Sequence, residues 1–600
     1  MVAKNSSKKS QSGQAIVLFT MMVASVMVPI TGLAIDGGRA YLVRLKLSSA
    51  VDGGALAAAR LLGTGANANT QLSNAQQTAI EFVKANFPTG FFGANLATGS
   101  PNVCVDPGTD NSDPCHVGNG GTVQTYKVRT VSVTASAVMP ALFMGIFGLP
   151  NVSVASSGLA SRRDVRVVVV IDRSSSMSGY FGTGANSIIP MAQSFVNGFS
   201  GSGDLGGRDQ VGLVVFGGSG IVAYPPRDIT KDYTDYTQFT APDNNFKLAS
   251  NIPKYLADVA DGSNTGTAEA LYLAYMTLRA DAATNTDLST KLNVIVLFTD
   301  GIPNGITAFA DDPDLTAKYN KNFMLASTSN CPDLGSGTWA GTPVTTTAKN
   351  LIGWFSQWGG NVSGDTTHAP HGLFTSMMAF PYSGSYTGKG DDIDAYMKNA
   401  GQDNTVIPHW SDTDGLGHKC NTAQPMTSAT ISKFPDYDLF GNYTDLSKVP
   451  AVAGITPPTG PGGTPLYKLG SLWSTSTQCN KAIFDATKPT DACQVGLASW
   501  QAAAHQAWKI WNQIVWDKTT RTNIQDPAAN LSQPVIFTIG FAHKADDMPD
   551  MTLLQMIAND PAAPVAFSSR INGQAFLAAD PNAVGAAFQQ IASEILRLSK

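Results

Sequence analysis

The stretch VRVVVVIDRSSSM, residues 165–177, is the part of this 600-residue chain that decides its fold. Its β-branched run Val167–Ile171 is typical of a strand that is buried on both faces. Three further runs of this kind lie at 211–216, 294–298 and 535–541. Amphipathic helical patterns lie between or after them, at 192–199, 268–278 and 584–598. Buried strands that alternate with amphipathic helices predict an α/β fold with a doubly wound, mostly parallel sheet.

Oxygen-bearing side chains follow two of these strands. Asp172, Ser174 and Ser176 come directly after the first strand, and Asp300 follows the strand at 294–298. In a doubly wound sheet, ligands bind outside the carboxyl ends of the strands, so these side chains are expected to meet at one edge. We expect Asp172 to lie at the exposed end of its strand and not in the core.

A third loop adds hydroxyl groups to the same edge. The sequence DGSNTG at 261–266 opens the helical pattern at 268–278 and carries Ser263 and Thr265. Carboxylate and hydroxyl oxygens are hard donors that suit an octahedral Mg²⁺ or Mn²⁺. The candidate metal ligands are therefore Asp172, Ser174, Ser176, Ser263, Thr265 and Asp300.

The N-terminus carries a membrane signal. Residues 15–35 hold no charge, and 21 residues suffice to cross a hydrocarbon core of about 30 Å. Lysines in the preceding residues 1–14 predict a cytoplasmic tail, with the bulk of the chain periplasmic or extracellular. A cleaved signal peptide is the alternative, because small residues lie at 32–34. The run exceeds the usual apolar length of such peptides, which favours a retained single-pass anchor.

Charge and cysteines agree with that compartment. The formal net charge of −5 argues against nucleic-acid binding. All six cysteines follow the apolar run, which predicts disulfides outside the cytoplasm. Cys104 and Cys115 would close a short loop. The other four allow three pairings: Cys331, Cys420, Cys479 and Cys493.

The pattern along the chain predicts six segments. After the tail and the anchor, residues 36–163 read as a continued helix followed by antiparallel strands. The α/β domain then occupies 164–304 and 499–600. It is interrupted at 305–498 by a long insertion that is rich in Gly, Thr, Ser and Asp and that holds four cysteines. An insertion of this length predicts a separate, disulfide-stabilised lobe. A tryptophan-rich helix expected near 500–516 would pack the lobe on the domain.

The motifs DRSSSM, GSNT and FTDG, with the later strand IFTIGF, resemble a von Willebrand factor A (VWA) domain with its metal-ion-dependent adhesion site (MIDAS). The resemblance implies that Asp172, Ser174 and Ser176 form the first motif and Asp300 the third. The second-loop position is usually Thr in this family. Here Ser263 takes that place, and Thr265 is the alternative.

The N-terminal part resembles TadG-like pilus-assembly proteins. The resemblance is carried by the anchor from Gly13 to about Ala59, by VSVTASAVMPALFMGIFGLPNVSVASSGLASR at 131–162, and by the closing AAFQQIASEILRLSK. It implies a pseudopilin-like module and a component of a tight-adherence (Flp-type) pilus or secretion apparatus that is tethered in a bacterial inner membrane.

Three functions compete at this point. The first is a non-enzymatic binding protein whose metal ion accepts a carboxylate from a protein partner of the pilus or secretion machinery, or from a surface ligand. The second is a structural scaffold with a vestigial metal site. The third is a hydrolase with its active site in the insertion, for which the sequence offers no recognisable nucleophile and base. The binding protein is favoured.

Overall fold

The computed structural model divides into two compact units, one ending at Arg163 and one beginning at Asp164, which are described separately. It describes residues 11–62, 68–106, 129–177, 179–180, 186–197, 209–217, 220–224, 265–279, 291–309, 338–339, 342–343, 352–356, 434, 436–438, 440–455, 484–488, 492–517, 520, 522–527, 531–543, 548–563 and 571–598.

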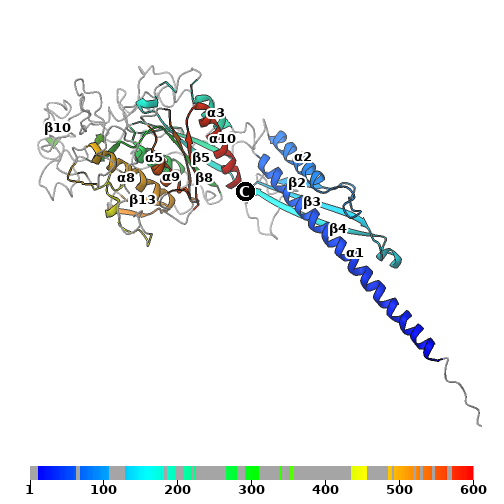
Figure 1. Cartoon of the computed structure of the whole chain (residues 1–600). Helices are drawn as coiled ribbons and strands as arrows, with labels where there is room; N and C mark the ends of the chain where they lie inside the picture. The colour runs from blue at the N-terminus through cyan, green and yellow to red at the C-terminus, as the bar shows by residue number, and fades with distance from the viewer. Residues whose placement is uncertain are drawn as a thin grey trace, which may run out of the picture. The chain divides into compact units, whose positions relative to one another are not determined.

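The first unit is built on one long helix, α1 (Gln11–Leu61). Its 51 residues extend for about 75 Å at 1.5 Å per residue. The large apolar side chains between Ile16 and Ile35 are exposed, whereas Val43, Leu47 and Val51 are fully buried. The N-terminal half of α1 therefore extends beyond the unit's core, and the C-terminal half belongs to that core (Figure 1).

Helix α2 (Ala68–Asn86) and an antiparallel sheet complete the first unit. The central strand β3 (Arg129–Pro140) pairs with three neighbours, β1 (Asn95–Leu96), β2 (Asn102–Asp106) and β4 (Asn151–Arg162). Strand β3 alternates buried with more exposed residues along most of its length, as expected of a strand with one face on a core. Its buried face packs on α1, which also contacts β4.

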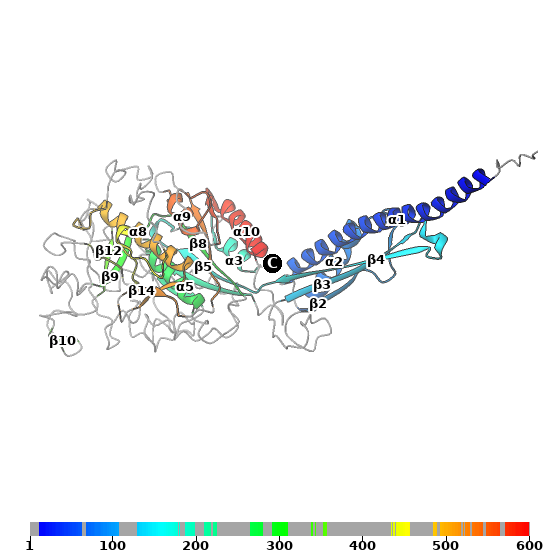
Figure 2. The same cartoon turned by 90° about the horizontal axis from the view of Figure 1, so that it is seen from below.

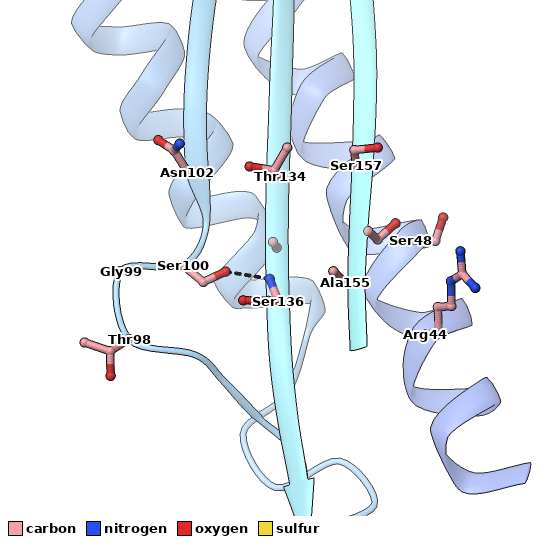
Figure 3. Close-up of a pocket in the computed structure, with 12 residues that line it drawn as sticks. Arg44, Ser48, Thr98, Gly99, Ser100, Asn102, Thr134, Ser136, Ala155 and Ser157 are labelled. Atoms are coloured by element: carbon pink, nitrogen blue, oxygen red, sulfur yellow. Dashed lines mark hydrogen bonds between the residues drawn. The ribbon is translucent and has the colours of Figure 1, made fainter. Parts of the chain in front are cut away.

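The first unit also contains a hollow lined mostly by hydroxyl-bearing side chains. The first-unit hollow, of about 610 Å³, lies between α1 and the strands and is lined by Ser48, Thr134 and Ser157, among others (Figure 3). At its floor the backbone N–H of Ser136 donates a hydrogen bond of 2.8 Å to Ser100 Oγ. Its lining carries no carboxylate, so it offers no anionic ligand for a cation.

The second unit holds a six-stranded sheet in the order β16-β15-β8-β5-β6-β7. All neighbouring pairs are parallel except β6 with β7. The strands are β5 (Val165–Asp172), β6 (Gln210–Phe216), β7 (Gly220–Tyr224), β8 (Leu292–Thr299), β15 (Val535–Phe541) and β16 (Ala575–Ala578). Each residue of β5, β6, β8 and β15 is buried. The predicted α/β fold and its four buried strands are confirmed, and the edge strands β7 and β16 are additional.

Helices cover both faces of this sheet. Helices α3 (Ile189–Asn197) and α10 (Pro581–Leu598) lie side by side on one face, where the ring centroids of Phe195 and Phe588 are 5.0 Å apart (Figure 2). The other face carries α5 (Thr267–Arg279), α8 (Ala492–Trp511) and α9 (Met551–Ala558). The expected helices are present. Of the pattern at 192–199, residues 198–199 lie outside the described residues.

The tryptophan-rich helix differs from its prediction. It begins at Ala492 and ends at Trp511, and Trp516 lies instead on β13 (Ile514–Asp517), which pairs with β14 (Thr522–Gln525). Trp500, Trp508 and Trp511 are among the largest fully buried side chains. Residues 494–512 are all buried, including the polar Gln501, His505 and Lys509, so no exposed polar face marks the end of α8.

The described part of the insertion belongs to the sheet domain's core. The ring of Phe440 packs against that of Tyr272 on α5, with 4.4 Å between the centroids, and the Phe440 carbonyl accepts a 2.7 Å hydrogen bond from Lys509 Nζ on α8. Tyr437 contacts the ring of Trp516 at 4.8 Å. Residues 434–455 are therefore not part of a separate lobe, because they are buried against α5 and α8.

Elsewhere in the insertion the described residues include two short strand pairs. Strand β9 (Gly305–Phe309) pairs with β12 (Ile352–Ser356), and β10 (Thr338–Trp339) pairs with β11 (Thr342–Pro343). Two cysteines lie in the described residues, Cys104 in β2 and Cys493 in α8, and neither is a free thiol. Cys115, Cys331, Cys420 and Cys479 lie outside the described residues, so the pairings stay predictions.

Asp550 joins two elements of the second unit. Its buried carboxylate caps α9 by accepting the Leu553 N–H at 3.0 Å, and it accepts Trp500 Nε1–H from α8 at 3.0 Å. Burial raises the pKa of Asp550, and the hydrogen bonds from Leu553 and Trp500 partly offset that effect. A raised folded-state pKa stabilises the fold fully below the unfolded-state pKa, and this contribution disappears as the pH rises through the folded-state pKa.

We predict that Asp550→Ala lowers the free energy of unfolding by about 1–3 kcal/mol, because two buried donors lose their acceptor. Asp550→Asn keeps an acceptor oxygen and should lose less. The stability of the wild type relative to Asp550→Asn should improve as the pH falls toward about 4. Urea unfolding at several pH values measures both effects. Asp580→Ala, which removes the exposed cap of α10, is the control, and an equal loss there would contradict the prediction.

Candidate metal centre

The candidate site lies where the chain changes direction across the sheet. From β5 the chain continues to its neighbour β6, and it later returns to β8 on the other side of β5. Parallel pairing aligns Ile171 of β5 with Phe298 of β8, so both strands end at the same level. In such sheets, ligands usually bind at the carboxyl ends of two adjacent strands whose following connections lead to opposite sides of the sheet. Asp172 and Asp300 therefore meet there.

The loop after β5 is held in shape by Asp172. One carboxylate oxygen accepts the backbone N–H of Ser174 at 2.7 Å, and the other accepts the hydroxyl of Thr299, the last residue of β8. The turn η2 (Ser175–Met177) follows. These bonds tie the first loop to the end of β8.

The hydroxyl groups of the first loop converge on Asp300. Ser174 Oγ and Ser176 Oγ lie 3.0 Å apart. They lie 3.4 Å and 3.0 Å, respectively, from Asp300 Oδ1. Asp300 is fully buried, Ser174 is nearly so, and Ser176 is partly exposed. Three oxygens from two loops thus form one cluster that opens toward the surface at Ser176.

Thr265 belongs to the same neighbourhood. Its backbone N–H donates to Asn304 Oδ1 at 2.8 Å, and the Asn304 N–H returns a bond of 3.1 Å to the Thr265 carbonyl. Its hydroxyl lies so close to Gly301 that a Cβ there would be only 3.0 Å away. Thr265 is therefore fixed beside the residue that follows Asp300. The competing Ser263 lies outside the described residues.

The donor set fits a small divalent cation. Two octahedral ligands at right angles, each about 2.1 Å from Mg²⁺, are themselves about 3 Å apart. The separations of 3.0 and 3.4 Å within the cluster are close to that value. Among the described residues no three His, Cys, Asp or Glu side chains gather as a metal group. The cluster thus offers the oxygen donors that Mg²⁺ and Mn²⁺ prefer, with few protein charges.

The structure corrects the expected position of Asp172. Its side chain is completely buried, although it ends a strand at the ligand-binding edge of the sheet. Both of its oxygens accept hydrogen bonds from the protein, whereas Asp300 Oδ1 faces the two serine hydroxyls. Asp172 is thus positioned to shape the loop and Asp300 to offer an oxygen within the cluster.

The sequence reasoning missed His543. This residue follows β15, the strand beside β8, and its Nδ1 lies 3.6 Å from Asp300 Oδ2. The imidazole is buried and stacks on Phe541 at 5.0 Å. It therefore lies on the side of Asp300 opposite the serine cluster. The signal was available, because His543 comes two residues after a predicted strand whose carboxyl end reaches the same edge.

Comparison with known families identifies two parts of the chain. Residues 13–61 match the Flp pilus-assembly TadE/G-like family, and residues 167–324 match the von Willebrand factor type A domain. The chain therefore carries a TadE/G-like segment near its N-terminus and a VWA-type domain. Both resemblances noted in the sequence are thereby confirmed. A comparison with the curated proteins gave no match.

Several solved structures are similar to the chain at low identity. The pilus adhesin SpaC from Lactobacillus rhamnosus GG is 13% identical over 78% of this chain and 32% of its own, with a TM-score of 0.28. The PilB minor pilin from Streptococcus sanguinis is 11% identical over 84% and 79%, with a TM-score of 0.30.

The vWF domain of Mfa5 from Porphyromonas gingivalis, a type V pili tip protein, is 16% identical over 74% of this chain and 98% of its own, with a TM-score of 0.24. The chain spans about a third of the length of SpaC. At TM-scores below 0.5, these similarities carry no argument about the site.

We predict that Asp300→Asn lowers the affinity of the VWA domain for Mg²⁺ by about tenfold or more, because it removes a charged ligand. Asp172→Asn should also weaken binding, while melting in EDTA stays equal or rises as carboxylate repulsion is relieved. Asp172→Ala is a poorer probe, since it leaves two buried donors without an acceptor. Calorimetric titration and thermal melts measure these effects. Asp580→Asn is the control, and an unchanged titration in Asp300→Asn would remove the site.

A second prediction distinguishes the two hydroxyl candidates. Thr265→Val removes a hydroxyl at constant shape and should weaken Mg²⁺ binding, because Thr265 lies against Gly301. Ser263→Ala should change it little. The matched control is Thr277→Val on α5, whose hydroxyl donates within its own helix to the Leu273 carbonyl at 2.8 Å. Stronger loss in Ser263→Ala than in Thr265→Val would reverse the assignment.

Proposed function

We propose that this protein is a membrane-anchored, extracytoplasmic binding component of a tight-adherence pilus or secretion apparatus. It uses a MIDAS in its VWA domain to bind an acidic group on a protein partner or a surface ligand. The observation that carries the proposal is the convergence of Ser174 Oγ, Ser176 Oγ and Asp300 Oδ1 at the carboxyl edge of the sheet. A role in a pilus is supported by the TadE/G-like and VWA family matches.

The proposed ligands act by positioning one divalent cation, Mg²⁺ or Mn²⁺. Ser174, Ser176 and Thr265 or Ser263 supply neutral oxygens, Asp300 supplies a carboxylate, and Asp172 holds the first loop. The cation, when bound, supplies a Lewis acid that attracts a carboxylate. Because most protein ligands in this set are neutral, little of the cation's charge is cancelled before the partner arrives. The partner's carboxylate then adds the missing negative charge.

Helix α1 supports the proposed anchor. It is long and apolar enough to cross a membrane by length and composition, with a mean hydropathy of 2.2 in its most apolar window. The hydroxyls of Thr20 and Ser25 donate to the carbonyls of Ile16 and Met22 within the helix, which suits an apolar surrounding. The helix also continues without a break past residues 32–34, the position of the alternative cleavage site. We propose a cytoplasmic N-terminus in the inner membrane.

The second candidate function is a structural scaffold for pilus assembly. It is favoured by the first unit, whose α1, α2 and sheet enclose a core of their own and whose family match concerns pilus assembly. In that case the metal site would be vestigial and binding would not depend on cations. The hydrolase alternative concerned residues 305–498, most of which lie outside the described residues.

A pull-down separates binding protein from scaffold. Full-length protein in detergent is immobilised and exposed to a cell-envelope extract with Mg²⁺ or with EDTA. We expect specific partners in Mg²⁺, their loss in EDTA, and the same loss in Ser176→Ala. Ser593→Ala, which removes an exposed serine hydroxyl of α10, should bind as the wild type does. Capture of the same partners in EDTA and by Ser176→Ala would favour the scaffold.

A further inference from the structure

The turn between β3 and β4 exposes an unusual amount of apolar surface. Its sequence, ALFMGIFGL at 141–149, lies between Pro140 and Pro150 and has no polar side chain. Four large side chains are between 53% and 78% exposed: Leu142, Ile146, Phe147 and Leu149. Large exposed apolar side chains that are grouped on one short turn indicate a contact with a membrane or with another protein.

The backbone of this turn is largely satisfied from within. Ala141 N–H donates to the Pro150 carbonyl at 2.9 Å, and three further internal bonds of 3.1–3.2 Å start from Ile146, Gly148 and Leu149. The flanking prolines have no N–H to satisfy. A turn with apolar side chains and paired backbone donors can enter hydrocarbon, where unpaired N–H groups are strongly disfavoured.

Three more donors of the turn are held by α1. The buried carboxylate of Asp36 accepts the N–H groups of Leu142, Phe143 and Met144 at 2.9–3.0 Å. Arg39 lies 3.4 Å from the same carboxylate. Asp36 is the first charged residue after the uncharged run at 15–35, so it fixes the turn at the end of that run.

The turn then follows α1 back into the uncharged run. Phe143 covers Gly32 so closely that a Cβ on the glycine would lie 2.6 Å from it. Further along, Ile146 and Phe147 line a cavity of about 320 Å³ together with Ser25, Val28 and Pro29 of α1. From Asp36 back to Ser25 the helix axis extends for about 16 Å, roughly half of a hydrocarbon core. Figure 2 shows the hairpin's turn beside α1, which continues beyond it.

We propose that residues 141–149 insert into the membrane leaflet on the Asp36 side, beside α1. The helix and the loop then both anchor the protein in the bilayer. This inference rests on the proposed anchor, because the loop lies beside the uncharged run of α1 and enters the bilayer only if that run does. Lipid is favoured over a protein partner because the loop is wholly apolar and continuous with the exposed apolar face of α1. Protein interfaces normally add a polar rim.

Photocrosslinking tests the loop directly. The photoreactive residue p-benzoyl-phenylalanine replaces Phe147 in the full-length chain, which is reconstituted in phosphatidylethanolamine and phosphatidylglycerol vesicles. The same replacement at Phe19, 69% exposed on α1, reports on the anchor alone. Leu159, 58% exposed on β4, is the control outside the bilayer. Its neighbour Gly158 lies against Asp52, about 24 Å along α1 from Asp36.

We expect lipid adducts at Phe147 and Phe19 and none at Leu159. Adducts at Phe19 without adducts at Phe147 would overturn the inserted loop and leave the anchor standing. No adducts at either position would refute the anchor and the loop together. Adducts at Phe147 to protein, in native membranes, in place of lipid would overturn the inference in favour of a docking surface.

A positioning test follows from Asp36. In an Asp36→Ala background the turn loses the acceptor for three N–H groups, so lipid adducts at Phe147 should fall severalfold while those at Phe19 stay unchanged. Asp52→Ala, which removes another carboxylate of α1 from outside the uncharged run, is the matched control. Equal adduct yields at Phe147 in both backgrounds would overturn the role assigned to Asp36.

Discussion

The parallel pairing of β5 with β8 is the constraint on which the second unit and its candidate site depend. Seven consecutive residues of β5, from Val165 to Ile171, pair with β8. This pairing brings together two strand ends that are more than a hundred residues apart in sequence. The bond from Thr299 to Asp172 and the approach of Ser176 to Asp300 both follow from it. A shift of this register by one residue would move every side chain of the strand to the opposite face of the sheet.

A long interruption of the chain does not divide this unit. Strands β8 and β15 are adjacent and parallel, although the insertion lies between them in sequence. The described residues 434–455 add side chains to the same core, where Phe440 meets Tyr272 and Lys509. Burial against α5 and α8 gives the insertion a fixed attachment to the domain. The site lies at the sheet's carboxyl edge, where loops can vary while the strands beneath them stay packed.

The first unit uses one helix in two environments. The same α1 presents apolar side chains outward near its N-terminus and buries Val43 and Val51 in a protein core further on. Asp36 marks the change, because it is the first charge after the uncharged run and is neutralised by Arg39 and three N–H donors. A single carboxylate thereby connects the membrane-competent part of the helix to the β3–β4 hairpin.

Local sequence patterns were sufficient for the four buried strands, for α3, α5 and α10, and for naming most residues of the candidate site. Continuous β-branched runs identified β5, β6, β8 and β15 because a strand buried on both faces has no polar alternation. The spacing of Asp172, Ser174 and Ser176 and the position of Asp300 after a strand predicted their convergence. Edge strands such as β16 gave no such signal, because they are short and only partly buried.

Tertiary structure decided the features that depend on contacts between distant segments. The bonds between Thr265 and Asn304, the burial of Asp172 and the approach of His543 to Asp300 all join different loops. The end of α8 at Trp511 and the place of Trp516 on β13 depend on packing around an almost wholly buried helix. By itself the sequence determined which residues could form strands, helices and an oxygen-rich edge. Only the fold decided which atoms meet there, because hydrogen bonds and burial are set by neighbours in space and not along the chain.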